Sequence, residues 1–334
     1  MKKSTIKAVI QNKVDSWLAS ITDKTLAESV RQHVIVTGGC IPSMFLNEKV
    51  NDYDVYIDNY DVLLQLTKYY VAQFNAEKGS LKRKGAAAYT PEVREITRPN
   101  INGETERRIV IYMQSSGVAG EQQAEQSYSY FESQPETLAD QFLARDIADI
   151  DSGPEIEDML KDPVAVAEGF RDDIIKNKRA FKPIFMTDNA ITLSDKLQLI
   201  IRFYGSPEEI HKNFDYLHAT CWYHTKTKEL VIPDGALESM LTKQLFYTGS
   251  LYPVASVFRM RKFLKRGWNI SAGQILKVLS QLSKVDFTNI EMLKEQLAGV
   301  DVAYMRDLIE ALSSTSERID ATYIAKLVDS IFED

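Results

Sequence analysis

Residues 37–58 read TGGCIPSMFLNEKVNDYDVYID, and this stretch decides the fold. Two adjacent glycines, Gly38 and Gly39, follow a short run of β-branched residues, and an apolar strand with aspartates at alternate positions comes after them. Successive side chains of a strand point to opposite faces, so Asp52 and Asp54 share one face. Like charges at this spacing repel, and a core does not tolerate them unpaired. A positive partner is therefore expected between the two carboxylates.

Two interpretations of this pattern stay open. A bare Asp-X-Asp pair is most often a solvent-exposed strand face, or it is neutralised by nearby lysine and arginine side chains. The other interpretation is a ligand site, and the glycines favour it, because a glycine turn between a strand and a helical turn lets backbone N–H groups approach a phosphate. Two carboxylates that hold a divalent metal beside such a turn are the smallest set of groups that can bind a nucleoside triphosphate together with Mg²⁺.

The segments around this stretch predict a mixed α/β domain. Apolar residues at helical spacing indicate one or two helices within residues 5–31. A strand at 33–39, a helix at 41–49, a strand at 52–58 and an amphipathic helix at 60–76 follow. This order of strand, glycine turn, helix, strand and helix is typical of a mixed sheet with helices packed on it.

The remaining residues divide the chain into three parts. The predicted elements after residue 77 are a strand at 109–114, helices at 135–150 and 163–181, a strand at 191–205, a capped helix at 206–214, a hairpin at 215–233 and helices from 234 onward. The predicted parts are an N-terminal helical segment (1–31), a domain at 32–233 with an insertion at about 77–190, and a helical C-terminal region (234–334).

The composition is that of an ordinary globular chain. Its 334 residues carry a net charge of −7, with a pI of about 5.4. Affinity for nucleic-acid phosphate comes from accumulated Lys and Arg, so any nucleic-acid contact of this acidic chain is expected to be local. The two cysteines, Cys40 and Cys221, argue against a disulfide framework. The sequence shows no secretory signal and no membrane-spanning apolar run, so we expect a soluble, cytoplasmic protein.

The glycine pair and the acidic strand together resemble a known signature. Thr-Gly-Gly at 37–39, a spacer of twelve residues and Asp-Tyr-Asp-Val at 52–55 are similar to the motif of the polymerase-beta-like nucleotidyltransferase superfamily. The superfamily includes poly(A) polymerases, CCA-adding enzymes, antibiotic adenylyltransferases and protein-modifying members. Within it the chain resembles nucleotidyltransferase-like proteins of tailed bacteriophages, which also carry segments similar to FRMRKFLKRGW (258–268) and NFDYLH (213–218). The resemblance implies a nucleotidyltransferase-like mixed sheet core.

The resemblance also implies site residues and a metal cofactor. Enzymes of this superfamily use two Mg²⁺ ions, one of which lowers the pKa of the attacking hydroxyl while the other braces the triphosphate. By position, Asp52 and Asp54 would bind metal and act in catalysis. Gly38 and Gly39, with Ser43 in the following helix, would hold the triphosphate.

Active members of the superfamily usually have a third carboxylate on a neighbouring strand. Asp215 is our candidate for this catalytic and metal-binding acid, because it starts a predicted strand directly after a capped helix. The alternative is an aspartate that ends a helix in a turn. Glu106 and Glu95 are the fallback candidates. Residues 40–43 (Cys-Ile-Pro-Ser) replace the small-Val-Arg-Asp run of CCA-adding enzymes, so the nucleotide selection of those enzymes is not expected to transfer.

A basic segment supplies a further candidate contact to phosphate. Arg259, Arg261, Lys262 and Lys265 lie in one segment with interleaved aromatic residues and no acid. Such a segment could grip a triphosphate or a nucleic-acid backbone, with the rings available for stacking on bases. The alternative is a helix that buries its aromatic side and leaves its basic side in water.

Other motifs argue against other chemistries. His218, Cys221 and His224 do not converge on a zinc ion if they lie on one strand, because 221 faces away from the two histidines. The sequence has no Walker-type Gly-Lys-Ser/Thr and no Gly-X-Ser-X-Gly elbow, so P-loop phosphotransfer and serine hydrolysis lose support.

Two functions follow from these observations. The leading function is Mg²⁺-dependent transfer of a nucleoside monophosphate from an NTP to an acceptor, which could be an RNA 3′ end, a protein side chain or a small molecule. The alternative is a catalytically inactive protein that keeps the fold and has a binding or structural role, for instance in a phage particle. The expected partners are therefore an NTP, an RNA or protein acceptor and phage structural proteins, with no membrane.

Overall fold

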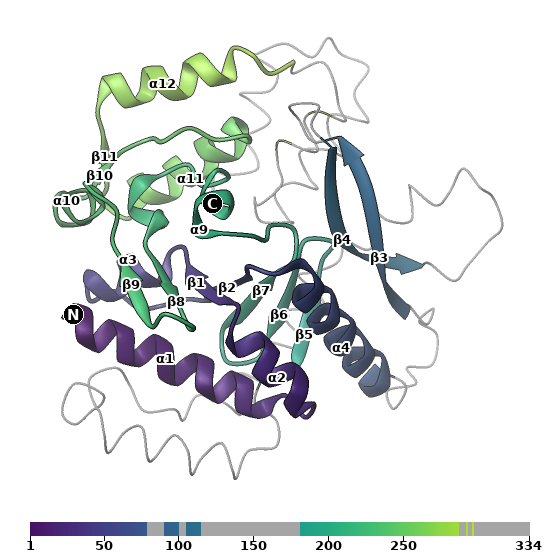
Figure 1. Cartoon of the computed structure of the whole chain (residues 1–334). Helices are drawn as coiled ribbons and strands as arrows, with labels where there is room; N and C mark the ends of the chain where they lie inside the picture. The colour runs from purple at the N-terminus through teal and green to yellow at the C-terminus, as the bar shows by residue number, and fades with distance from the viewer. Residues whose placement is uncertain (79–89, 100–104, 115–180, 287–291, 293–295, 297–334) are drawn as a thin grey trace.

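The computed structural model describes residues 1–78, 90–99, 105–114 and 181–286, together with Met292 and Gln296 (Figure 1). The helices of this part are α1 (Lys3–Ser20), α2 (Lys24–Arg31), α3 (Cys40–Phe45), α4 (Tyr60–Lys78), α9 (Pro207–His211), the 3-10 helix η1 (Leu217–Thr220), α10 (Ala236–Thr242), α11 (Pro253–Lys265) and α12 (Ala272–Leu282). The strands are β1 (Val34–Thr37), β2 (Tyr53–Ile57), β3 (Thr90–Pro99), β4 (Thr105–Gln114), β5 (Pro183–Met186), β6 (Ala190–Leu193), β7 (Leu197–Ile200), β8 (Trp222–His224), β9 (Glu229–Val231), β10 (Gln244–Leu245) and β11 (Asn269–Ile270).

One mixed sheet organises these elements. Its strand order is β5-β6-β7-β2-β1-β8-β9, with β2 parallel to β7 and antiparallel to β1. Strands β3 and β4 form a separate hairpin to one side of the sheet (Figure 1). Strands β10 and β11 pair in a short parallel ladder. The predicted mixed α/β fold class is therefore confirmed.

The two faces of the sheet are covered unequally. Val36 and Val55 point to the face covered by α1, α2 and α4, where one large apolar cluster holds most of the core. Ile35 and Tyr56 point to the opposite face, where their buried cluster has one further fully buried member, Ile210 of α9. Alternate residues of a strand share a face, so Asp54 lies on the same side as Tyr56. Asp54, the acid within β2, thus lies on the thinly covered face.

Helix α1 shows how the large cluster forms. Ile6, Ile10, Val14 and Trp17 recur at intervals of three or four residues, and all four are buried. Each such side chain contributes about 1.5–3 kcal/mol relative to an exposed position. The indole N–H of Trp17 donates a hydrogen bond to the Tyr70 hydroxyl of α4 at 2.7 Å. Burial and this bond hold α1 on the domain, and the helices predicted at the N-terminus are confirmed as α1 and α2.

Two predicted elements are wrong in detail. The single strand predicted at 191–205 is a hairpin of β6 and β7, because Asp195 and Lys196 adopt positive φ and reverse the chain between them. The hairpin predicted at 215–233 turns where expected, between β8 and β9, but its first part forms η1 instead of strand. Asp215 therefore precedes a short helix and does not open a strand.

The capped helix was predicted correctly. Ser206 accepts a hydrogen bond from the Glu209 N–H, and the Glu209 carboxylate accepts one from the Ser206 N–H, so α9 starts with a capping box. Strands β3 and β5 have no counterpart among the predicted elements. The helices predicted at 135–150 and 163–181 lie outside the described residues, except for Phe181 at the end of the second, which is in a turn. The three-part division of the chain stays a prediction. No helix in the described ranges is both long and apolar enough to cross a bilayer.

Candidate functional site

The turn expected from the glycine pair connects β1 to α3. Gly38 has a φ of +88°, in the region that L side chains rarely adopt. Its N–H donates to the carbonyl of Ala219 at 3.2 Å, so that N–H is used inside the fold. Gly39 is the N-cap of α3, and a Cβ placed on it would meet no atom within 4 Å. Gly39 is therefore the glycine whose surface is open to a ligand.

Two carboxylates lie beside this turn, and we call Asp52 and Asp54 the acidic pair. Asp52 is exposed, whereas Asp54 is half-buried on β2 with its carboxylate packed on Gly38. Burial, together with the negative charge of Asp52, raises the pKa of Asp54 to about 8. The pKa of the buried Cys40 thiol is raised well above its ordinary value, by burial first and then by both carboxylates. The structure thus brings the acidic pair and the glycine turn together.

The positions beside Asp54 in the sheet carry neutral side chains. Its partner on β1 is Thr37, and its partner on β7 is Gln198. Thr37 Oγ1 donates to the carbonyl of Cys221 at 2.8 Å, which leaves it to accept from Nε2 of His211 at 2.9 Å. Burial lowers the pKa of His211 to about 4, so this imidazole is neutral at pH 7. Neither His211 nor Gln198 was predicted from the sequence, although His211 lies in α9, the helix that the capping box indicates.

Asp215, the candidate third carboxylate, is paired with an arginine. It is buried, and it accepts a hydrogen bond from Nε of Arg259 at 2.7 Å. The Arg259 charge also reaches Tyr56: burial and Asp54 raise the pKa of this tyrosine, and Arg259 opposes them. The Asp215–Arg259 ion pair therefore lies on the acid-bearing side of the sheet, but the arginine neutralises the acid expected to bind metal.

The fallback acids are paired with arginines as well. Glu106 lies 2.8 Å from Arg108, and Glu95 lies 3.3 Å from Arg107, all within the β3–β4 hairpin. Across the ranges that the structure describes, no three His, Cys, Asp or Glu side chains are grouped so that they could hold a metal ion. The expected cluster of the acidic pair with a third carboxylate is not assembled there.

The basic segment forms α11, but its cations do not converge on one point. Arg261 is two residues and Lys265 six residues from Arg259, so both project from other sides of α11. Lys262, three residues on, shares the side of Arg259. Lys262 and Lys265 are exposed, and Arg261 is half-buried. The charge of Arg259, one of the four predicted phosphate contacts, reaches Tyr56 on the acid-bearing face.

The aromatic residues of this segment, and Ser43, belong to the interior. Trp268 is buried, and its ring centroid lies 4.2 Å from that of His218. Phe263 packs on the same imidazole at 4.6 Å. These rings are therefore committed to packing, which favours a helix that buries its aromatic side over one that stacks on bases. Ser43 is buried in α3, away from the open surface of the turn.

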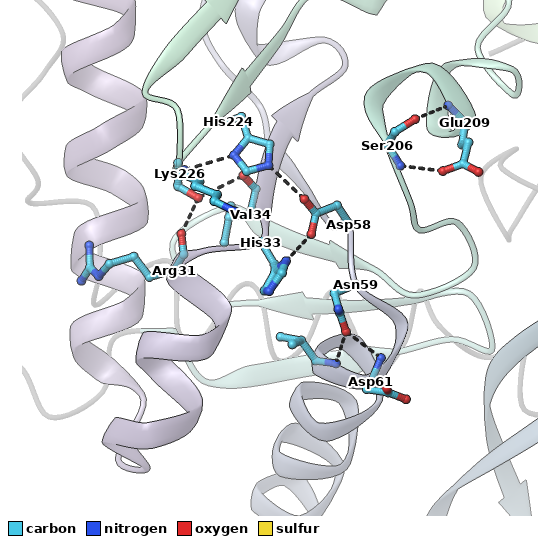
Figure 2. Close-up of polar contacts among 12 residues, drawn as sticks. Arg31, His33, Val34, Asp58, Asn59, Asp61, Ser206, Glu209, His224 and Lys226 are labelled. Atoms are coloured by element: carbon cyan, nitrogen blue, oxygen red, sulfur yellow. Dashed lines mark hydrogen bonds and ion pairs between the residues drawn. The ribbon is translucent and has the colours of Figure 1, made fainter.

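Asp58, at the far end of β2 from the acidic pair, joins two histidines (Figure 2). Its carboxylate contacts Nδ1 of His33 and, at 3.0 Å, Nε2 of His224. Nδ1 of His224 accepts from the Lys226 N–H, so its Nε2 carries the proton that Asp58 accepts. These bonds lower the pKa of Asp58 against the opposing effect of burial. The cluster ties β2 to β8 and to the residue before β1.

The chain is a mixed α/β protein in which the glycine turn and the acid-bearing strand, the two parts of the signature noted in the sequence, lie side by side. The chain belongs to the Gabija anti-defense 2 family, whose model matches residues 8–243, more than half of the chain. Gabija anti-defense 2 of Bacillus phage SPbetaL7 is 23% identical over 107 residues, which make up 31% of this chain and 27% of the relative.

Two solved structures are similar to the chain at a low level. The Thermotoga maritima CCA-adding enzyme complexed with tRNA is 10% identical with a TM-score of 0.34, over 94% of this chain and 58% of that one. The Bacillus stearothermophilus CCA-adding enzyme in complex with CTP is 9% identical with a TM-score of 0.30, over 83% of this chain and 47% of that one. The chain thus matches about a quarter of the phage relative and about half of each enzyme.

Proposed function

We propose that this protein is a phage anti-defence factor that acts in the host cytoplasm as a nucleotidyltransferase. It binds a nucleoside triphosphate at the glycine turn and the acidic pair, and it transfers the nucleoside monophosphate to an acceptor. The anti-defence role is supported by the family match over residues 8–243 and by the phage relative. One observation carries the transfer reaction: the Asp54 carboxylate is packed on the left-handed turn at Gly38, with Asp52 beside it, on the thinly covered face of the sheet.

Catalysis of this transfer requires mainly that the protein position the charged groups of the reaction. An acceptor oxygen or nitrogen bonds to the α-phosphorus and loses its proton, while the bond from the α-phosphorus to pyrophosphate breaks. Gly39 offers open backbone to the triphosphate. The acidic pair can hold the divalent cation that accompanies an NTP, and a bound Mg²⁺ would neutralise phosphate charge there. The acceptor is an RNA 3′ end, a protein side chain or a small molecule.

Label transfer tests the proposal directly. The purified protein is incubated with each α-labelled NTP and Mg²⁺, once with RNA and once with host-cell extract, and label is counted in RNA, in protein and in small molecules. The wild type should transfer label from at least one NTP. A double variant, Asp52→Ala with Asp54→Ala, should transfer none, whereas the exposed-site control Asp61→Ala should match the wild type. Nucleotide binding is measured separately as thermal stabilisation by NTP with Mg²⁺.

A second candidate function is binding without catalysis, and the arginine pairing of Asp215 favours it. In this alternative the protein keeps the fold and acts as a binding or structural component, for instance with phage structural proteins. Phage plating on cells that carry Gabija separates the two functions. The Asp52→Ala, Asp54→Ala variant should lose protection of the phage if transfer is required, and it should retain protection if the protein acts by binding alone.

A further inference from the structure

A two-metal site needs more ligands than the acidic pair supplies. Two catalytic cations lie about 3.5–4 Å apart and are clamped by ligands that they share. Asp54 lies in β2, and Asp52 is the residue just before the strand begins at Tyr53. The charge of Asp52 acts on Asp54, so the two carboxylates are close enough to suit one ion between them. Mg²⁺ with a nucleotide is commonly held by one or two carboxylates, the phosphates and several waters. The acidic pair fits that smaller requirement.

Among the described residues, the strands on either side of β2 place no further acid opposite Asp54. Neighbouring strands lie about 4.8 Å apart, so the nearest side chains on the same face are the two cross-strand partners of Asp54. These are Thr37, whose hydroxyl is already bonded to Cys221 and His211, and Gln198. An amide oxygen lacks the negative charge that a second cation would need beside the first. The register therefore puts a neutral group where a third carboxylate could stand.

Acids from other elements are held elsewhere. Asp215 is buried against Arg259, and a move toward β2 would leave that guanidinium without the carboxylate it contacts at 2.7 Å. Glu95 and Glu106 are paired with arginines of the β3–β4 hairpin. Within the described part of the chain, no group of three metal-ligating side chains forms. The residues that the structure describes therefore fit one cation and do not fit the two that the nucleotidyltransferase resemblance implies.

We propose that the acidic pair binds one divalent cation per chain, together with the nucleotide, and that Gln198 occupies the position from which a carboxylate would admit a second ion. This inference rests on the proposed function, because the cation enters with the NTP. It adds the number of cations bound per chain, and it gives a role to Gln198, which lies outside the sequence motif.

Counting bound Mn²⁺ by electron paramagnetic resonance tests the inference without any reaction. The protein is titrated with Mn²⁺ in the presence of a non-hydrolysable NTP analogue, and the same titration of Asp52→Asn, Asp54→Asn gives the background. The wild type should bind one ion more than this variant. Gln198→Glu should bind two ions more than the same background variant. The control Thr192→Glu puts the acid one strand further away, on β6 opposite Gln198, and should stay at one.

The outcomes separate the inference from the function on which it rests. Two ions above background in the wild type would overturn the single-cation site and leave the nucleotide site standing. No ions above background would overturn both. If Gln198→Glu stays at one ion, the role given to Gln198 is wrong. Thermal melting checks that each variant folds, and if Gln198→Glu fails to fold, the wild-type count alone decides the stoichiometry.

Discussion

The α-carbon of Gly38 lies directly against the carboxylate of Asp54, so that a Cβ on the glycine would stand 2.6 Å from Oδ2. The two residues belong to different elements, yet the antiparallel register of β1 and β2 brings the turn after Thr37 over the side chain opposite it. A larger residue at the turn would displace the acid. Glycine is required here both by the positive φ and by the carboxylate.

The first prediction concerns this contact. Gly38→Ala should lower the free energy of unfolding by about 2 kcal/mol or more, because an L residue is strained at this φ and its methyl group overlaps Asp54. Gly39→Ala should cost about 1 kcal/mol or less, since its φ is −68° and nothing lies within 4 Å. Urea denaturation measures both effects.

A double-mutant cycle separates the two causes of the Gly38→Ala cost. Adding Asp54→Ala removes the overlapping carboxylate and should recover about 1 kcal/mol, leaving the backbone strain. Equal costs of Gly38→Ala with and without Asp54 would show that the contact does not matter.

The second prediction concerns the raised pKa of Asp54. In the folded protein this acid keeps its proton up to about pH 8, whereas the unfolded chain releases it near 3.8. The folded state therefore binds more protons between these values, and its stability falls as pH rises from about 4 to 8. Asp54→Asn removes this loss and should be more stable than the wild type at pH 8, by roughly 1–2 kcal/mol, with no gain near pH 4.

Thermal melting of both proteins across pH 4 to 9 measures this effect. Asp52→Asn serves as a second variant, because it removes the neighbouring negative charge and should lower the pKa of Asp54. The loss of stability with rising pH should then end at a lower pH than in the wild type. A constant difference between Asp54→Asn and the wild type at every pH would contradict the prediction.

The local part of the site was predictable from sequence, because it lies within one continuous stretch. The glycines of 37–39 and the acids of 52–55 are joined by a short helix. The spacing of apolar residues predicts these elements, and the elements in turn place the glycines beside the acids. The acid-bearing face was also correctly assigned, since alternation along a strand depends only on parity.

The surroundings of the site depend on pairings between distant residues, which no local pattern encodes. Gln198 reaches Asp54 because β7 returns to the sheet beside β2, and Arg259 reaches Asp215 from a helix 44 positions later. Asp215 looked like the start of a strand, but η1 follows it. Partner strands and ion pairs of this kind are determined by tertiary packing, so the pairing of Asp215 with Arg259 could not be predicted from the sequence.

The third prediction concerns Asp58, which accepts hydrogen bonds from both His33 and His224. An amide offers one acceptor oxygen and one donor nitrogen, and His224 must donate because its Nδ1 is occupied by the Lys226 N–H. In Asp58→Asn the one oxygen can serve His224, but the NH2 group can bond to His33 only if Nδ1 of His33 accepts, and neither bond is then made to a charged carboxylate. The substitution should cost about 1.5–3 kcal/mol at pH 7.

The pH dependence of this cost follows from the lowered pKa of Asp58. The stabilisation is present above the ordinary value of 3.8 and is lost as pH falls through the lower folded-state pKa. The gap between Asp58→Asn and the wild type should therefore narrow below about pH 4. Chemical denaturation at pH 7 and pH 3 measures it, with the exposed Asp61→Asn as the control that should change little. A gap of equal size at both pH values would argue against the charge-based account.

The fourth prediction concerns His218, a buried imidazole that contacts Phe263 and Trp268. In the described part of the chain neither of its ring nitrogens has a hydrogen-bond partner. Burial, with a smaller contribution from the Arg266 charge, lowers the pKa of His218 to about 3. The folded state thus holds this residue neutral while the unfolded chain takes up a proton near pH 6.5. Stability contributed by the neutral ring is complete above 6.5 and is lost as pH falls toward 3.

His218→Phe keeps an aromatic ring of similar size and removes the unpaired nitrogens, so it should raise the free energy of unfolding by about 1 kcal/mol at pH 7. It should also remove an acid-dependent loss of up to about 1.4 kcal/mol per pH unit between pH 6.5 and 3. Trp268→Phe changes the packing of the same cluster but keeps the histidine, so its acid-dependent loss should persist. Denaturation series at pH 7, 6, 5 and 4 compare the three proteins. If the slope of stability against pH is the same in His218→Phe and the wild type, His218 is not a source of acid sensitivity.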